Sequence, residues 1–251
     1  MTQHVDVAVV GAGFAGMLAA HNMRKLGLSV QGLEKGPEVG GTWYWNRYPG
    51  LRCDVESVEY SYSWDEELQQ DWTWSERYSA QPEILEYAKH VADRFKIREL
   101  FEFNTAVTGA IFDDRTNLWT VTTDKGESII AKWVIMATGA LSTPKPIDIK
   151  GHESFQGQSL YSTDWPTTPV DFSGKRVAVV GTGSTGIQLA THIAKTAKEL
   201  FVLQRTPSWS VPANNKPLTP EYVASVKANY AQERERKRHS MDGLGLPGPE
   251  K

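Results

Sequence analysis

The chain has 251 residues, 40% of them hydrophobic and 23% charged, with a formal net charge of −3. This balance is typical of a globular protein with one large or two modest domains. It gives no reason to expect nucleic acid or an anionic membrane as a partner, and no apolar run approaches the roughly 18 residues of a membrane span. The single cysteine, Cys53, excludes an internal disulfide and favours a reducing, cytoplasmic location.

The N-terminal stretch follows the order strand, glycine-rich turn, helix. Residues 5–10 form a β-branched run typical of a buried parallel strand. Gly11, Gly13 and Gly16 then form the motif G-x-G-x-x-G, and residues 17–26 predict a helix. In a dinucleotide-binding unit the first glycine makes the turn, the second lets the backbone approach a pyrophosphate, and the third lets helix and strand pack closely. The helix N-terminus offers its N–H groups to the phosphates.

The same order recurs between residues 176 and 195. A strand is predicted at 176–180, the glycine motif at 181–186 and a helix at 187–195. One such turn is weak evidence, because ordinary strand–helix connections also carry glycines. Two of them in one chain predict two bound dinucleotides.

The residues at the end of each unit's second strand indicate which dinucleotide each unit binds. Glu34 ends the first unit, and a carboxylate there can accept hydrogen bonds from an adenosine ribose. Arg205 and Thr206 end the second, where a cation and a hydroxyl suit a 2′-phosphate. The first unit is therefore predicted to bind FAD (or NAD) and the second NADP. A solvated strand-end acid at Glu34 and a surface arginine at Arg205 are the alternatives.

An aromatic segment, GGTWYWNRYPGLRCDVES, occupies residues 40–57. Its glycines, proline and asparagine predict loops rather than a regular element. It can line a site for a flat ring system, or it can be a tryptophan-rich core loop. The segment resembles the flavin-contacting segment of the Baeyer–Villiger monooxygenases, and within them the phenylacetone, steroid and cyclohexanone monooxygenase group.

That resemblance implies a role for Asp54. The family's aspartate at this position helps to orient an active-site arginine, for which residues 1–251 have no matching position. A carboxylate beside a reduced flavin needs such a cation, because its pKa otherwise rises. Asp54 is thus the predicted catalytic residue, and a loop acid that caps a backbone N–H is the alternative.

The resemblance and the two glycine motifs together give the predicted cofactor sites, with no metal site. The FAD set is Gly11, Gly13, Phe14, Ala15, Gly16, Glu34, Lys35, Thr42, Trp43, Trp45, Asp54, Tyr60 and, as an adenine contact, Val107. The NADP set is Arg52, Cys53, Asp54, Gly181, Thr182, Gly183, Ser184, Thr185, Gly186, Gln188, Arg205 and Thr206.

A second family fingerprint, F-x-G-x-x-x-H-x-x-x-W-P, lies between the two units. Phe155, Gly157, Trp165 and Pro166 match it, whereas Tyr161 stands at the histidine position. The motif resembles an interdomain hinge, and its ending favours the Baeyer–Villiger branch over the flavin-containing and N-hydroxylating monooxygenases. The tyrosine puts the coupling between NADP movement and flavin chemistry in doubt.

The remaining stretches complete the predicted architecture. Residues 55–100 are predicted to be helical and surface-facing, and residues 101–136 to be β-rich with a small β-meander. Residues 218–230 predict a helix, and the charge run at 233–239 a solvated helix end.

The fold class predicted is α/β, with two Rossmann-like dinucleotide-binding units (FAD, then NADP), a small β-meander insertion, and the C-terminal half of the family fold absent. The predicted domains are an incomplete FAD-binding domain at 1–146 with its meander at about 101–130, a hinge at 147–170, a partial NADP-binding domain at 171–240 and a disordered tail at 241–251.

The resemblance implies an FAD- and NADPH-dependent oxygenation of a small-molecule ketone by O₂ to an ester or lactone, through a C4a-peroxyflavin. By comparison with the family's length we expect a truncated chain, inactive alone or needing a complementing C-terminal fragment. The alternatives are an N-hydroxylating or S-oxygenating flavin monooxygenase and a non-catalytic FAD-binding remnant.

Overall fold

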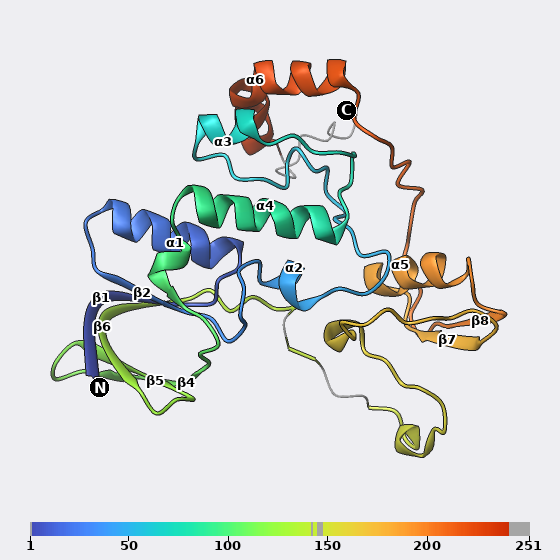
Figure 1. The fold of residues 1–251 in the computed structure, drawn as a ribbon, viewed down its shortest axis with the longest axis horizontal. Helices are drawn as coiled ribbons and strands as arrows, with labels where there is room; N and C mark the ends of the chain where they lie inside the picture. The colour runs from blue at the N-terminus through green and yellow to red at the C-terminus, as the bar shows by residue number, and fades with distance from the viewer. Residues whose placement is uncertain (1, 142, 145–147, 241–251) are drawn as a thin grey trace. The chain divides into compact units, whose positions relative to one another are not determined.

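The computed structural model of the chain describes residues 2–141, 143–144 and 148–240, and it divides into two compact units (Figure 1). Unit 1 is drawn from the ranges 1–48 and 85–171, and unit 2 from 49–84 and 172–251. Residues 49–84 thus pack with the second unit, although they lie inside the predicted domain 1–146. The tail predicted at 241–251 lies outside the described residues. Which nucleotide each unit binds stays a prediction.

Unit 1 is built on a six-stranded sheet of order β3-β2-β1-β6-β5-β4. The strands are β1 (Thr2–Val10), β2 (Val30–Leu33), β3 (Phe101–Glu102), β4 (Val107–Asp113), β5 (Leu118–Thr123) and β6 (Ser128–Met136). β1 pairs in parallel with β2 and with β6, whereas β4, β5 and β6 form antiparallel pairs. The predicted α/β class with a small antiparallel insertion is confirmed.

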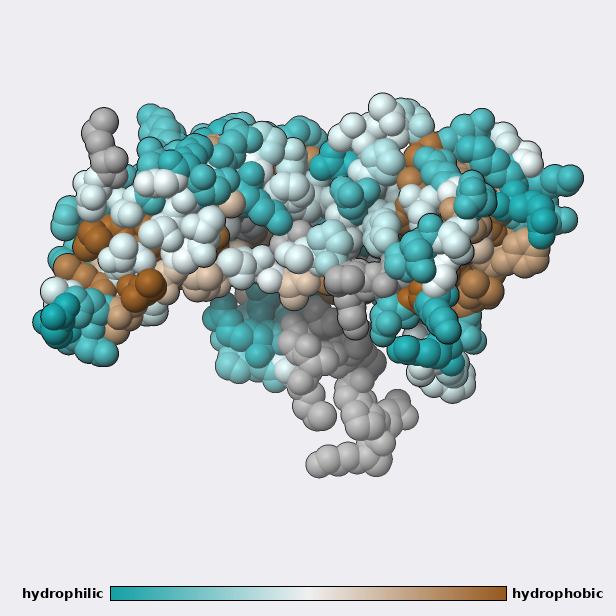
Figure 2. All heavy atoms as spheres, turned by 90° about the horizontal axis from the view of Figure 1, so that it is seen from below, coloured by the Kyte–Doolittle hydropathy of each residue, from teal (hydrophilic) through white to brown (hydrophobic). Residues whose placement is uncertain are grey.

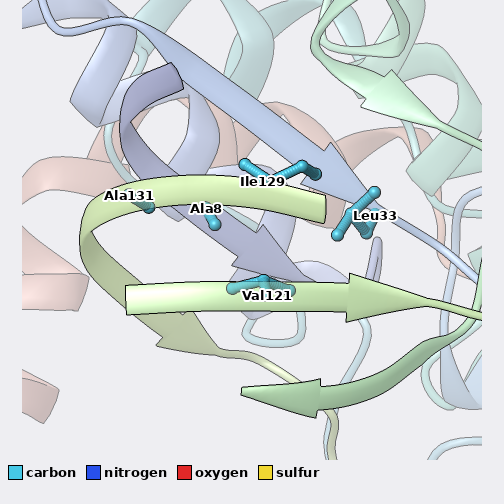
Figure 3. Packing of buried hydrophobic residues seen from close by; sticks show 5 residues of the cluster. All are labelled: Ala8, Leu33, Val121, Ile129 and Ala131. Carbon is cyan, nitrogen blue, oxygen red and sulfur yellow. The ribbon is translucent and has the colours of Figure 1, made fainter. Parts of the chain in front are cut away.

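The core of unit 1 lies on the faces of this sheet and consists largely of small and branched side chains. Figure 3 shows Ala8, Leu33, Val121, Ile129 and Ala131 in one buried cluster on one side of the sheet. Because successive side chains of a strand point to opposite faces, the neighbours of Ala8 in β1 point to the other face, where they are equally buried. β1 is therefore covered on both faces, which fixes its C-terminal end and the turn that follows it.

Two helices cover the second face of the sheet, α1 (Phe14–Lys25) and α4 (Gln81–Arg94) (Figure 1). Phe14 stacks on Tyr87 with ring centroids 6.1 Å apart, and the Arg24 guanidinium donates to the Phe95 carbonyl oxygen at 2.5 Å. Tyr87 and Val91 are fully buried. The prediction of a surface-facing helical region at 55–100 is therefore wrong for α4, because its apolar stripe packs on α1 rather than facing water.

The rest of residues 55–100 is less helical than predicted. Besides α4 it contains only α3 (Glu66–Asp71) and a short 3₁₀ turn, η1 (Arg98–Leu100), among its described residues. The Asp65 carboxylate accepts a hydrogen bond from the Leu68 N–H at 2.7 Å and so caps α3. Between α3 and α4 the chain forms bends and isolated bridges instead of a regular element. It pairs there with residues 216 and 217, as in the Arg77 N–H to Lys216 carbonyl bond of 2.9 Å.

Unit 2 holds a two-stranded parallel sheet, β7 (Arg176–Val180) and β8 (Glu199–Leu203), joined by α5 (Ser184–Ile193). Hydrophobic surface lies over this region in Figure 2, and Val180, Val202 and Leu203 are 63%, 44% and 53% exposed. The second unit thus repeats the order strand, glycine turn, helix, strand of the first unit, but its sheet has two strands instead of six. Further short elements in the chain are α2 (Thr42–Trp45), η2 (His152–Ser154) and η3 (Ser162–Asp164).

The last helix, α6 (Pro220–Arg238), starts two residues after the predicted start at 218 and runs through the charge run, with Thr219 as the N-cap and Pro220 in the first turn. Its charge run is not a fully solvated end, contrary to the prediction. Arg234 donates to the Ser61 hydroxyl at 2.8 Å and to the Val58 carbonyl at 3.2 Å, and Lys237 forms an ion pair with Glu59. Charged side chains along a helix can bind to another part of the protein or face the solvent, and the sequence does not distinguish these two cases.

Candidate dinucleotide-binding sites

The first glycine turn is enclosed by backbone on two sides. Gly11 has a φ of +101°, and its N–H donates to the Leu33 carbonyl oxygen at 2.8 Å. A Cβ added at Gly11 would lie 2.6 Å from the Ala137 carbonyl oxygen, and one at Gly16 only 1.8 Å from the Gly11 carbonyl oxygen. No side chain fits at either position, because both contacts are to backbone. These two glycines therefore build the turn.

Glu34 is buried beside this turn and is 5% exposed. One carboxylate oxygen accepts the Ala12 N–H at 2.7 Å, and the other accepts the Gly36 N–H at 2.8 Å. The alternative of a solvated strand-end acid is thus excluded. Each carboxylate oxygen can accept a second hydrogen bond, so a fixed acceptor remains available at the end of β2, where the sequence predicts a ribose.

The aromatic segment starts with a short helix, α2, and not with the loop that the sequence predicts. Gly40 and Gly41 both have positive φ, and the Gly40 N–H donates to the Ala12 carbonyl oxygen at 3.0 Å. A Cβ at Gly41 would lie 2.8 Å from the Gly13 Cα. The segment is therefore pressed onto the first glycine turn, and the two glycines allow one helical turn to follow.

The side chains of the aromatic segment divide between core and surface. Trp43 is 6% exposed and belongs to the core, whereas Thr42 and Trp45 are half-buried. The Lys35 ammonium group lies 4.6 Å from the ring centroid of Trp45, a cation–π contact. Unit 1 thus brings Lys35, Thr42 and Trp45 to the neighbourhood of the first turn. Val107 packs half-buried against the core cluster of the sheet.

The second glycine turn has the same backbone as the first but open surroundings. Gly181 has a φ of +103°, its N–H donates to the Leu203 carbonyl oxygen at 2.8 Å, and a Cβ at Gly186 would lie 2.1 Å from the Gly181 carbonyl oxygen. A Cβ at Gly183 would meet nothing within 4 Å. Gly183 and Ser184 are exposed, so the start of α5 is accessible.

The end of β8 contains one residue that the sequence reasoning missed. Leu33 and Leu203 hold equivalent places in the two turns, so Gln204, not Arg205, is the counterpart of Glu34. The Gln204 amide donates to the Thr182 hydroxyl at 3.0 Å, and Arg205 and Thr206 follow with exposed side chains. Counting from the strand end in both units would have found it. A carboxylate at this place would repel a ribose 2′-phosphate, whereas the neutral amide of Gln204 does not.

The predicted site residues from 52 to 60, which include the second half of the aromatic segment, lie in unit 2. Arg52 is half-buried, Cys53 is buried, Asp54 is exposed, and Tyr60 is half-buried. Burial raises the pKa of the Cys53 thiol to about 11. The predicted NADP residues therefore share one unit, while the predicted FAD set is divided between both, with Asp54 and Tyr60 in the second.

The two turns fit the pyrophosphate of a dinucleotide. Gly13 and Gly183 are the N-caps of α1 and α5, both with extended backbone (φ of −75° and −71°) and neither with a side-chain cap. The first N–H groups of a helix have no intrahelical partner, and together with the helix dipole they attract phosphate. A bulky or acidic N-cap would block this approach, and here there is only glycine.

Within residues 2–141, 143–144 and 148–240, no group of three His, Cys, Asp or Glu side chains is placed to hold a metal ion. No helix there is long and apolar enough to cross a membrane.

Fold and turns together define an α/β protein with two dinucleotide-binding turns. A sequence model of the pyridine nucleotide-disulphide oxidoreductase family matches residues 8–240, and the chain belongs to this family. The one cysteine of residues 1–251 cannot itself form a disulphide centre within them.

Individual proteins similar to this chain indicate which group within the family it resembles. The chain is 46% identical to a Baeyer–Villiger monooxygenase of Pseudooceanicola batsensis, over 90% of this chain and 41% of that protein. It is 42% identical to a phenazine N-monooxygenase of Lysobacter antibioticus, over 91% of this chain and 42% of that protein. A structure of oxidized steroid monooxygenase bound to NADP shares 48% identity and a TM-score of 0.93, over 99% of this chain and 48% of that one.

The recognition of the Baeyer–Villiger monooxygenase group from residues 40–57 and 155–166 is thereby confirmed. The chain spans about half or less of the length of the relatives that it matches.

Proposed function

We propose that this chain forms the FAD-binding and NADPH-binding part of a Baeyer–Villiger monooxygenase. The observation that carries the proposal is the pair of matching glycine turns with different strand-end residues. The first turn ends at the buried acceptor Glu34, and the second at the neutral Gln204 followed by the cation Arg205. Similarity to monooxygenases of this group supports it.

Each group of residues has a defined task in this proposal. The N–H groups at the start of α1 hold the FAD pyrophosphate, and the Glu34 carboxylate, fixed by Ala12 and Gly36, accepts from the ribose. The start of α5 holds the NADPH pyrophosphate. Arg205 and Thr206 bind the 2′-phosphate through charge-assisted hydrogen bonds, and Thr42 and Trp45 lie along the flavin nucleotide.

The reaction proposed for the whole protein is the insertion of one oxygen atom of O₂ next to the carbonyl of a small-molecule ketone. FAD and NADPH supply the redox chemistry, and the protein positions and shields it. Asp54 is exposed, so its carboxylate can be reached by another side chain. We propose that it orients a cationic side chain contributed by the remaining length of the protein, supplied in solution as a complementing C-terminal fragment.

A visible absorption spectrum of the purified chain after gel filtration tests the cofactor assignment. Oxidised flavin absorbance eluting with monodisperse protein is expected. Well-folded protein that takes up no flavin when FAD is added would contradict the proposal.

The NADPH assignment is tested separately with Arg205→Ala. Because Arg205 is assigned to the 2′-phosphate, NADPH should bind about tenfold more weakly, the cost of one charge-assisted contact, while NADH affinity should not change. Titration of both nucleotides into wild type and variant measures this. An equal loss for both nucleotides would discard the 2′-phosphate assignment.

An N-oxygenating activity is the second candidate, favoured by the similarity to a phenazine N-monooxygenase. Product analysis of the whole protein with ketone, aromatic amine and sulfide substrates separates the candidates. An ester or lactone identifies the Baeyer–Villiger reaction, and an N-oxide the alternative. A protein that binds FAD but never oxidises NADPH would be the non-catalytic remnant.

A further inference from the structure

Gln188, in the middle of α5, is half-buried and contacts the segment that carries Arg52, Cys53 and Asp54. Its side-chain amide makes two hydrogen bonds to one residue. Nε2 donates to the Arg52 carbonyl oxygen at 3.0 Å, and Oε1 accepts the Arg52 N–H at 3.4 Å. An amide that pairs with both backbone groups of one residue acts like a neighbouring strand.

The same segment is pressed onto the same helix two residues earlier. Gly50 has a φ of +84°, and a Cβ there would lie 2.9 Å from the Gln188 carbonyl oxygen and 3.3 Å from the His192 Cβ. Only glycine combines this backbone conformation with so close an approach. Gly50 and Arg52, two residues apart, therefore contact one turn of α5.

The other side of the segment is held by residues 76–81. The Arg52 guanidinium donates from Nη1 to the Tyr78 carbonyl oxygen at 2.7 Å and to Glu76 at 3.1 Å. The Cys53 N–H donates to the Ser79 carbonyl oxygen at 3.0 Å. Gln188 on one side and residues 76–79 on the other thus hold Arg52 and Cys53, and all of these residues lie in unit 2. Asp54 is the next residue of the segment.

We propose that Gln188 is a positioning residue, which fixes the Arg52–Asp54 segment to α5 instead of binding the nicotinamide nucleotide itself. The inference rests on the proposed function, because it is the NADPH-binding helix that would hold the segment carrying Asp54. Helix α5 and the Arg52–Asp54 segment then form one rigid body. The direct contact that the sequence predicts for Gln188 would be replaced by an indirect effect.

The single cysteine provides the assay. Cys53 is 5% exposed, so a maleimide reagent reaches its thiol only when the segment opens, and labelling of the ligand-free chain at constant pH reports that opening. Gln188→Met keeps the size of the side chain and removes both hydrogen bonds. It should label about tenfold faster than wild type, as expected for two lost hydrogen bonds. The control Lys195→Gln, exposed just after α5, should label like wild type.

A second variant protects the test against a folding defect. Gln188→Glu keeps an acceptor for the Arg52 N–H but places another oxygen against the Arg52 carbonyl, so its labelling should also accelerate. Wild-type labelling rates in both folded variants would overturn the inference. So would unchanged labelling with weakened NADPH binding, since that result shows direct contact. If wild type binds no NADPH, the proposed function fails, while the labelling ratio still decides the role of Gln188.

Discussion

The two glycine turns of this chain have nearly the same backbone in very different surroundings. In both, the first glycine has a φ near +100° and donates to a leucine at the end of the next strand. The first turn is enclosed by residues 40–41 and 137 and belongs to a six-stranded sheet. The second belongs to a two-stranded sheet, and nothing lies within 4 Å of a Cβ at Gly181 or Gly183.

The comparison separates what the motif requires from what its surroundings add. The contact between the third glycine and the first carbonyl recurs in both turns, because a helix cannot start that close to a strand otherwise. Strand-end chemistry differs: Glu34 accepts two backbone N–H groups, whereas Gln204 donates to a hydroxyl. Two turns of the same backbone geometry thus have a hydrogen-bond acceptor at the end of the first unit's second strand and a donor at the end of the second unit's.

The largest expected effect is that of alanine at the third glycine. Gly16→Ala and Gly186→Ala would place a Cβ 1.8 and 2.1 Å from a backbone oxygen, so each should destabilise its unit by about 3 kcal/mol. Hydrogen exchange read separately on peptides of the two units measures this. If the turns are equivalent, each substitution loosens its own unit. Native-like protection in both variants would show that the turns can widen.

A smaller difference in the free energy of unfolding is expected between substitutions at Glu34 and Gln204, the residues that follow β2 and β8. Glu34→Ala leaves two backbone N–H groups without their acceptor in a buried place and should cost about 2 kcal/mol. Gln204→Ala removes one hydrogen bond at an exposed position and should cost at most about 0.5 kcal/mol. Chemical denaturation of both variants is the measurement. Equal losses would mean that the surroundings of the two turns do not matter to stability.

Alanine at the second glycine should affect binding and leave folding intact. A Cβ at Gly183 meets nothing, and one at Gly13 approaches only to 3.5 Å, an ordinary contact. Both variants should keep wild-type melting temperatures, while the Cβ keeps the pyrophosphate from the helix start and weakens binding at least about tenfold. Gly13→Ala should affect FAD alone and Gly183→Ala NADPH alone. A variant that binds its nucleotide normally would remove that turn from the proposed site.

The smallest effect concerns alkaline pH and unit 2. Burial raises the pKa of the Cys53 thiol from an ordinary 9.0 to about 11. The neutral thiol therefore contributes stability that is complete below pH 9 and lost as the pH rises from 9 to 11, about 1 kcal/mol of it by pH 10. Buried Tyr230, whose pKa is also raised by burial, acts in the same direction. Cys53→Ser should reduce the loss between pH 8 and pH 10, and an unchanged loss would assign it to other groups.

Much of this architecture can be predicted from the sequence because its signals are local. β-branched runs bounded by glycine motifs predict β1, β7 and their turns, and the pattern of residues 218–230 predicts the first part of α6. Gly16 and Gly186 are needed for close contacts to Gly11 and Gly181, five residues before each of them, so their meaning can be read from spacing. The resemblance in residues 40–57 rests on the same kind of contiguous pattern.

Contacts between distant segments could not be predicted in this way. The sequence does not reveal that residues 49–84 pack with residues 172–240, that α4 turns its apolar stripe to α1, or that Arg234 docks on residues 58–61. Nor does it reveal that Gln188 holds the backbone of Arg52, 136 positions away. Such pairings depend on which surfaces meet when the chain closes. The sequence alone determined the strands, the glycine turns and the family, since these depend on neighbouring residues, while only the tertiary structure decided which side chains serve the fold and which remain available to a ligand.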